Sequence, residues 1–485
     1  MNSYFFKISL AAIFLLISIG NFALLSKYNI YVGDDGYLAS YLYEYYFTGS
    51  RSFVLCSNWA IHQFLVGTLG PVYRGLYDLH LSFLEAVGAE YHYINGLSAL
   101  LFLLTLTMFI ATLVRIKRRW LVLIGVIIFG TLEPFLVMSH SIRTESVILF
   151  ALAVGTYSLT RSRADFITVS GLFFSASIIL NTHLGGWPLL VGLGAGVWYI
   201  FGGRSLMLYL IGAIVGLAIY LLLNDLFSFN ALTELANKYR EQGSVSTYTR
   251  FHVLNDIYAY YVHAKYKRHL IELIIIAAFI TVSTYWQKLS RSVRGVIFCT
   301  VSSFIAYIII FSYINSYYLV YFYYLMLVSA VLAGNEILSD QWSKYLVLPM
   351  IAPFVLLYAA LFFTFIKSPG WDEMIKKREL ILNHLPKGVL VAAPEYFVNL
   401  DPRQHRSFIP LAQAVSPGCI AGYDGVRDLD VIIADTRQRE MIASHLSDFN
   451  LVNQLKIGRL ATQSISDLGE LFIYTRMQKI TTDVK

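Results

Sequence analysis

The sequence predicts a polytopic α-helical membrane protein with a small C-terminal α/β domain outside the membrane. Of the 485 residues, 57% are hydrophobic and only 14% are charged, whereas a soluble protein carries about 25% charged residues. Long apolar runs recur up to residue 366, and shorter ones bounded by turn residues follow. The low charge excludes a disordered chain, and three cysteines are too few for a disulfide scaffold.

About eleven transmembrane helices are expected. A helix needs roughly 20 mostly apolar residues to cross the hydrocarbon of a bilayer. The first stretch is predicted to be a retained span rather than a signal peptide, because its apolar run is long and no A-x-A site follows it. The predicted spans cover 7–26, 94–114, 120–138, 145–160, 166–182, 188–203, 205–223, 269–286, 295–313, 317–334 and 345–366.

Lysine and arginine residues predict the orientation. Cytoplasmic loops carry an excess of both residues, so the N-terminus is expected inside and, with an odd number of spans, the C-terminus outside. This bias explains the net charge of +7 without a nucleic-acid partner. The cytoplasmic turns hold Arg115, Lys117, Arg118, Arg119, Arg161, Arg163, Arg204, Lys288, Arg291, Arg294 and Lys344, whereas the short outer turns hold Arg143.

Two of the long outer segments connect spans. Residues 27–93 hold an aromatic amphipathic stretch after Gly36 and a second one from about Ile61 to Val87. Both patterns favour helices that lie along the membrane surface, and ordinary helices packed on the spans are the alternative. The other connecting segment covers residues 224–268, and residues 1–366 as a whole form the predicted membrane module.

Residues 367–485 are predicted to be a separate domain, because charge rises there and six of the eleven prolines lie in it. Short apolar runs at 389–393, 430–434 and 471–474 favour strands, and 404–414 and 436–448 have helical spacing. Cys56 and Cys419 would both lie outside the cytoplasm, where disulfides form, and whether they pair stays open.

An acidic pair begins the candidate chemistry. Asp34 and Asp35 stand in YVGDDGY shortly after the first span. Gly33 and Gly36 permit a tight backbone that directs both carboxylates into one site, where mutual repulsion raises one pKa unless a cation intervenes. Such a group suits deprotonation of a hydroxyl. The alternative is a solvated turn that caps the next helix.

Further polar residues cluster on the same predicted side. SHSIRTES holds His140, Arg143 and Glu145, and NTHLGGW holds His183. Polar groups are costly near a membrane, so these are candidate site residues. The alternatives are an Arg–Glu pair that neutralises itself and a histidine hydrogen-bonded at the interface.

A basic and aromatic stretch, YAYYVHAKYKRH, precedes the eighth span. Its cations suit an anionic lipid phosphate through charge-assisted hydrogen bonds, or are snorkelling interface residues. With the upstream arginine, the candidate substrate-binding residues here are Arg250, His263, Lys265, Lys267 and Arg268.

Several enzyme classes lack their motifs in this sequence. There is no phosphate-cradling glycine loop, no HExxH and no GxSxG. A secondary transporter or flippase is the main alternative from another class, and it should carry ionisable groups near the bilayer midplane. Here the polar clusters lie at the outer edge of the predicted spans.

The layout resembles the GT-C superfamily of integral-membrane glycosyltransferases, which includes protein O-mannosyltransferases, the lipid A aminoarabinose transferase and lipopolysaccharide sugar transferases. Asp34 and Asp35 stand where that superfamily has its DD, DE or DxD motif, and Glu145 resembles the acidic position of its second outer loop. No clear counterpart of its HPP-like segment is present, and residues 58–74 stand in that place.

The resemblance implies an inverting glycosyltransferase that moves a sugar from a polyprenyl-phosphate donor to a hydroxyl of a glycolipid, polysaccharide or protein. It implies that Asp34 or Asp35 is the general base, that Arg143 and the basic stretch hold phosphate, and that Glu145 orients Arg143 or the acceptor. A divalent metal ion at the acidic pair is a further possibility, with no other cofactor. A lipid-linked polysaccharide ligase or polymerase would share the donor. The expected location is a bacterial inner membrane.

Overall fold

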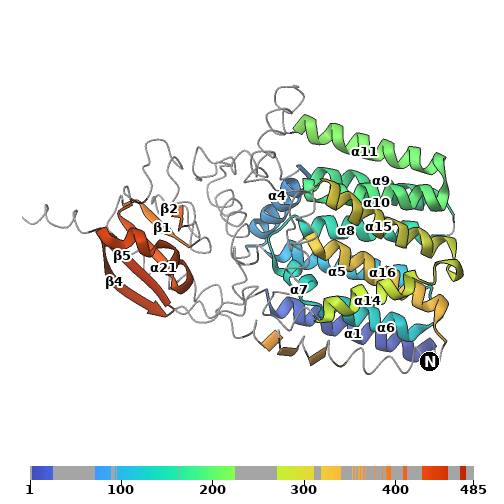
Figure 1. The fold of residues 1–485 in the computed structure, drawn as a ribbon, viewed down its shortest axis with the longest axis horizontal. Coiled ribbons are helices and arrows are strands. Elements are labelled where there is room, and N and C mark those ends of the chain that lie inside the picture. The colour runs from blue at the N-terminus through green and yellow to red at the C-terminus, as the bar shows by residue number, and fades with distance from the viewer. Residues whose placement is uncertain are drawn as a thin grey trace, which may run out of the picture.

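The computed structural model has two parts, a bundle of apolar helices and a small sheet beyond one end of it (Figure 1). It describes residues 3–25, 71–88, 93, 95–161, 163–223, 270–310, 318–339, 389–394, 408–411, 429–456 and 470–476, with isolated positions between 352 and 385 and at 426. The helical membrane fold and the C-terminal α/β region are therefore both confirmed.

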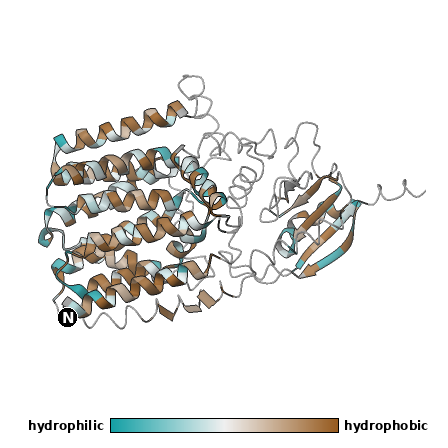
Figure 2. Ribbon diagram, turned by 180° about the vertical axis from the view of Figure 1, so that it is seen from behind, coloured by the Kyte–Doolittle hydropathy of each residue, from teal (hydrophilic) through white to brown (hydrophobic). Residues whose placement is uncertain are grey.

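The helices of the bundle run roughly side by side, and apolar residues dominate them (Figure 2). Of the described helices, α1, α5, α11, α15 and α16 are long and apolar enough to cross a membrane, and α6 with α7 forms a sixth, bent candidate. The helices are α1 (Ser3–Ala23), α4 (Pro71–Ala86), α5 (Gly96–Leu113), α6 (Arg119–Thr131), α7 (Glu133–His140), α8 (Glu145–Leu159), α9 (Phe166–Thr182), α10 (Trp187–Phe201), α11 (Gly203–Leu223), α14 (Leu270–Ser283), α15 (Arg291–Ile310) and α16 (Leu319–Ile337).

Helices cover ten of the predicted spans within the described residues, although α8, α9, α10 and α14 are shorter than a full crossing. Most of the eleventh span, 345–366, lies outside the described residues. The count of eleven therefore stays a prediction. Residues 71–86, within the second amphipathic stretch, form α4, which lies at the end of the bundle nearest the sheet (Figure 1).

The third predicted span, 120–138, is not one straight helix. Leu132 has extended backbone angles, and α6 and α7 meet there at a bend of 53°. Pro134 explains the break, because it lacks an N–H and its ring clashes with the carbonyl four residues earlier in a continuous helix. At the second residue of α7 these costs disappear, since the first N–H groups of a helix have no partner within it.

Contacts between distant segments place the basic turns at one end of the bundle. The Arg119 guanidinium lies over the Phe6 ring near the start of α1, 5.6 Å from its centroid. The Arg118 backbone N–H donates to Asn335 at the end of α16, 3.1 Å away, and the Ser290 N–H donates to Glu336. Residues 141–144, which hold Arg143, lie at the opposite end, because α6 and α7 run the length of the bundle between them.

Small residues bring neighbouring helices close together, as is common in membrane bundles. The Asn181 amide of α9 donates to the Gly216 carbonyl of α11 across 2.6 Å, and Ser177 donates to the Gly212 carbonyl across 2.9 Å. Gly192 of α10 lies against the Cys299 backbone of α15. These contacts hold α9 against α11 and α10 against α15.

The C-terminal region forms a five-stranded mixed sheet in the order β2-β1-β3-β5-β4, with α21 on it (Figure 1). Parallel pairs join β1 to β2 and β3, and antiparallel pairs join β5 to β3 and β4. Asp435 caps α21 by accepting the Gln438 N–H at 2.8 Å. The elements are β1 (Val391–Ala393), β2 (Phe408–Pro410), β3 (Val431–Asp435), α21 (Thr436–Ile442), β4 (Phe449–Lys456) and β5 (Glu470–Arg476).

Three predicted strands and the helix after 436 are confirmed, but the helix predicted over 404–414 is wrong where the structure describes it. Phe408, Ile409 and Pro410 pair in parallel with β1 instead. Pro410 ends this strand, since it has no N–H to continue a ladder. Strand β4 was not predicted, because its sequence FNLVNQLK lacks a clean alternation and a register shift interrupts its pairing at Leu451 to Asn453.

Candidate active site at the end of the bundle

A buried ion pair lies where α7 gives way to α8. Arg143 Nη2 donates to Glu145 Oε1 across 2.9 Å, and their side chains are 6% and 2% exposed. The Thr144 hydroxyl donates to Glu145 Oε2 across 3.3 Å. Glu145 is the first residue of α8, where the helix dipole stabilises a negative charge. The extended Ser141 ends α7, so a short loop carries Arg143 beside the carboxylate.

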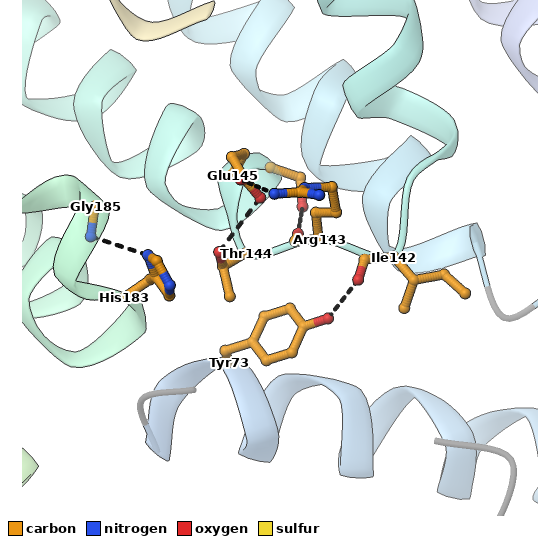
Figure 3. A network of polar contacts seen from close by, with 8 residues as sticks. Tyr73, Ile142, Arg143, Thr144, Glu145, His183 and Gly185 are labelled. Atoms are coloured by element: carbon orange, nitrogen blue, oxygen red, sulfur yellow. Dashed lines mark hydrogen bonds and ion pairs between the residues drawn. The ribbon is translucent and has the colours of Figure 1, made fainter. Parts of the chain in front are cut away.

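Helix α4 packs on this loop through the buried Tyr73 (Figure 3) and on the start of α5 through the buried Tyr77. The Tyr73 hydroxyl donates to the Ile142 carbonyl across 2.8 Å, and the Tyr77 hydroxyl shares a 2.7 Å hydrogen bond with Ser98 at the start of α5. Ser146 also donates to Ser98, across 3.5 Å. Helix α4, which lies in the second amphipathic stretch, therefore contacts the loop that carries the ion pair.

His183 borders the same region from the end of α9 and lies across from Thr144 (Figure 3). Its Nδ1 accepts the Gly185 N–H across 2.9 Å, so the proton of the neutral ring is on Nε2. Its ring lies 6.0 Å from that of Tyr318 at the start of α16. A Cβ at Gly185 would lie 2.7 Å from the Tyr318 ring, so the absence of a side chain permits this packing.

The structure brings Arg143, Glu145 and His183 together but gives His140 different surroundings. His140 is fully buried, its Nδ1 lies 2.6 Å from the Ser139 hydroxyl, and its Nε2 lies 3.1 Å from the Asn21 carbonyl. These contacts join the end of α7 to the end of α1. A substrate-binding role for His140 stays a prediction, and its described contacts are structural.

The remaining predicted site residues lie outside the described residues. Among the described residues, no group of three or more His, Cys, Asp or Glu side chains could hold a metal ion, so the divalent ion stays a prediction tied to the acidic pair. The residues concerned are Asp34, Asp35, Arg250, His263, Lys265, Lys267 and Arg268; Cys56 and Cys419 are outside as well.

Sequence reasoning missed the tyrosines that border the ion pair. Tyr321 of α16 is buried, and Glu145, Arg143 and Tyr318 all act electrostatically on its hydroxyl. The rings of Tyr318 and Tyr321 are stacked, with centroids 6.3 Å apart and planes at 12°. The run SYYLVYFYY carries a signal, since it starts a span with five tyrosines, but nothing in it indicates which ring faces the loop of α8.

The fold agrees with the GT-C resemblance of the sequence, because the solved structures that it is similar to are an ArnT and an archaeal oligosaccharyltransferase. The chain is similar to ArnT from Cupriavidus metallidurans bound to undecaprenyl phosphate, at 12% identity and a TM-score of 0.53, over 98% of this chain and 99% of that one. The apo state of ArnT gives 11% identity and a TM-score of 0.52, over 96% and 98% of the two chains.

An archaeal oligosaccharyltransferase from Archaeoglobus fulgidus, in complex with Zn and sulfate, has 8% identity and a TM-score of 0.52, over 95% of this chain and 74% of that one. No family model and no curated protein matches this sequence. At these identities the comparisons establish the fold, and the chemistry has to be argued from the residues.

Proposed function

We propose that this protein is an inverting glycosyltransferase that moves a sugar from a polyprenyl-phosphate donor to an acceptor hydroxyl on the outer face of the membrane. The observation that carries the proposal is a GT-C fold along nearly the whole chain, with a buried Arg143–Glu145 pair at the end opposite the basic turns. The similar ArnT structure holds undecaprenyl phosphate, which is the lipid carrier of a donor of the proposed class.

Chain connectivity supports a shared site. Helix α1 ends at Ala23 beside His140 of α7, so the acidic pair follows from that end of the bundle. Helix α14 begins at Leu270 and leads into the basic turn before α15, so Lys265, Lys267 and Arg268 attach at the same end as Arg143. A chain covers at most about 3.5 Å per residue. Arg268 precedes Leu270 by two residues and Asp34 follows Ala23 by eleven, so both segments can reach this end of the bundle.

The proposed reaction needs a base and a cationic site for the leaving group. Asp34 or Asp35 accepts the proton of the acceptor hydroxyl, whose oxygen attacks the anomeric carbon as the bond to the donor phosphate breaks. The lipid phosphate leaves with the bonding electrons, and Lys265, Lys267 and Arg268 stabilise its charge. Arg143 has five N–H donors. One of them is bound by the Glu145 carboxylate, which neutralises the charge of the guanidinium and orients it. A nucleotide is unnecessary, because the sugar is already activated by the lipid phosphate.

The acidic pair is tested by Asp34→Asn and Asp35→Asn in purified protein. We expect at least one variant to lose about a hundredfold or more in sugar transfer from polyprenyl phosphate, since general base catalysis contributes about 10² to 10⁴ in rate. An unchanged melting temperature would show that folding is intact. Normal turnover in both variants would remove the catalytic assignment.

Lipid analysis of a deletion strain tests the function itself. We expect a polyprenyl-phosphate sugar to accumulate and one glycan to lack a single residue. If the protein reconstituted in vesicles moved the intact polyprenyl-phosphate sugar from one leaflet to the other without breaking the sugar–phosphate bond, it would instead be a flippase.

A further inference from the structure

The Tyr321 hydroxyl is buried beside charged groups without a protein partner in the part of the chain that the structure describes. The residue is 1% exposed, and its oxygen makes no hydrogen bond there. Tyr324, one turn further along α16, has a hydroxyl that pairs with Thr156 across 2.9 Å. Leaving a buried hydroxyl unpaired costs free energy, so Tyr321 indicates a place where a ligand supplies the hydrogen bond.

The charges around this hydroxyl indicate which part of a donor lipid would bind there. Arg143 and Glu145 are paired across 2.9 Å, so together they present no net charge. A phosphate oxygen close to the Glu145 carboxylate would be repelled. A sugar hydroxyl both donates and accepts hydrogen bonds, as does a phenol. It can therefore donate to the Glu145 carboxylate, accept from the Arg143 guanidinium and do either with the Tyr321 hydroxyl.

Aromatic packing holds the Tyr321 ring in place. Tyr318 stacks on it, and the Tyr307 ring contacts Tyr318 edge to face with centroids 6.2 Å apart. His183, at the end of α9, packs against Tyr318 with ring centroids 6.0 Å apart. Fixed rings with a few convergent polar atoms are typical of the lining of small-ligand sites.

We propose that Tyr321, together with Glu145 and Arg143, binds the sugar group of the lipid-linked donor through the hydroxyls of that sugar. This inference rests on the proposed glycosyl transfer and assigns a subsite for the donor sugar to it. Tyr321 is thereby a residue that determines which sugar is accepted.

Tyr321→Phe tests the proposal, because it removes the hydroxyl and keeps the stacked ring. Binding to the purified full-length protein is measured by native mass spectrometry for undecaprenyl phosphate and for a panel of undecaprenyl-phosphate hexoses and pentoses. We expect wild type to bind at least one sugar-bearing lipid more tightly than the bare lipid. In Tyr321→Phe this advantage should fall about tenfold, the value of one hydrogen bond, with bare-lipid binding unchanged.

Tyr324→Phe is the matched control, since it removes a buried tyrosine hydroxyl from the same helix. It should lower the melting temperature by breaking the contact with Thr156 and should leave the preference for the sugar-bearing lipid intact. Tyr321→Phe should keep the wild-type melting temperature without lipid, because no protein hydrogen bond is lost.

Four outcomes would overturn the inference. An equal loss of both lipids in Tyr321→Phe would assign the hydroxyl to the phosphate, and no loss would leave it without a ligand role. A wild-type protein that binds bare undecaprenyl phosphate but prefers no sugar-bearing lipid would refute the sugar subsite while the donor class stands. Failure to bind any of these lipids would refute the proposed function as well.

Discussion

Arg143 and Glu145 depend on each other at the scale of single residues. Both are almost fully buried, and moving either charge out of water is costly unless its partner and further hydrogen bonds compensate. The sequence indicated an Arg–Glu pair in this turn, but not its burial beneath α4 or its position beside Tyr321. Those facts depend on residues far away along the chain, so no local pattern could predict them.

Arg143→Leu should strongly destabilise the protein, because it leaves the Glu145 carboxylate buried without its cation. Removing one partner of a buried pair costs about 3 to 5 kcal/mol. The double variant Arg143→Leu with Glu145→Leu should recover much of that stability and still lack transfer activity. Thermal unfolding in detergent and a transfer assay separate the two effects.

Arg161→Leu is the control for this comparison, since its partner Asp165 is 41% exposed. Exposed pairs contribute little to stability, so its unfolding should change only slightly. If Arg143→Leu were equally mild, the buried pair would not carry the stability argued for it.

Gly185→Ala should impair sugar transfer several-fold while the bundle stays folded. Its Cβ would lie 2.7 Å from the Tyr318 ring and 2.9 Å from His183 Nδ1, so the rings that border the site would have to move. Overpacking of this kind costs about 1 to 3 kcal/mol. Gly75→Ala on α4 meets nothing within 4 Å and should leave transfer unchanged, as measured in the same assay.

At the scale of elements, hydropathy predicted where helices occur and local chemistry decided how they end. The ten spans with described helices follow from apolar length alone. The bend at Leu132 follows from Pro134, which was visible in the sequence, but only the packing of α7 against α5 and α1 shows that the chain changes direction there. In the sheet, the three residues of β2 are held by pairing with β1, a non-local contact that overrides their helical spacing.

The contact between α10 and α15 depends on Gly192. A Cβ there would clash with the Ser303 hydroxyl and lie 2.5 Å from the Cys299 carbonyl oxygen. Gly192→Ala should therefore destabilise the bundle by about 1 to 3 kcal/mol, measured by thermal unfolding. Gly203→Ala, which meets nothing within 4 Å, should unfold like wild type; equal behaviour of the two variants would contradict the close packing.

The start of α9 should be sensitive to acid. Asp165 accepts the Thr168 N–H across 2.9 Å and a hydrogen bond from Arg161, and these contacts lower the pKa of its carboxyl to about 2. Because the folded pKa lies below the unfolded value of about 3.9, this stabilisation is complete above pH 4 or so and is lost as pH falls toward 2.

Hydrogen exchange of the first turn of α9 measures this effect. Asp165→Asn keeps the cap but removes the charge, so it should exchange faster than wild type at pH 6. The difference should shrink as pH falls to about 2, where half of the wild-type carboxyl is protonated, and should be lost below that pH. A difference that persisted unchanged at pH 2 would rule out the charge as its cause.

At the scale of the whole molecule, the bundle separates two kinds of charge. The described basic turns gather at one end, and the Arg143–Glu145 pair lies at the other, where α4 and the sheet are found (Figure 1). The charge bias predicts that the basic end lies in the cytoplasm, and in that orientation the site faces outward, where the proposed reaction uses lipid-linked sugars.

Cysteine labelling in intact cells tests this orientation. In a chain whose three native cysteines are replaced, Gly75→Cys on α4 and Gly203→Cys at the start of α11 both occupy exposed positions with open space. A membrane-impermeant maleimide should label the first and label the second only after lysis. The reverse pattern would invert the topology and place the site in the cytoplasm.

The sequence by itself determined the membrane class, the positions of most helices and the resemblance to GT-C enzymes. These features depend on apolar length and charge bias, which are properties of residues close together along the chain. Only the tertiary structure decided that α4 covers the Arg143 loop, that His140 joins two helix ends and that the buried Tyr321 interacts electrostatically with the ion pair. These arrangements depend on side chains from α4, α8, α9 and α16 meeting at one end of the bundle, and such contacts are fixed by packing between distant segments rather than by any local pattern.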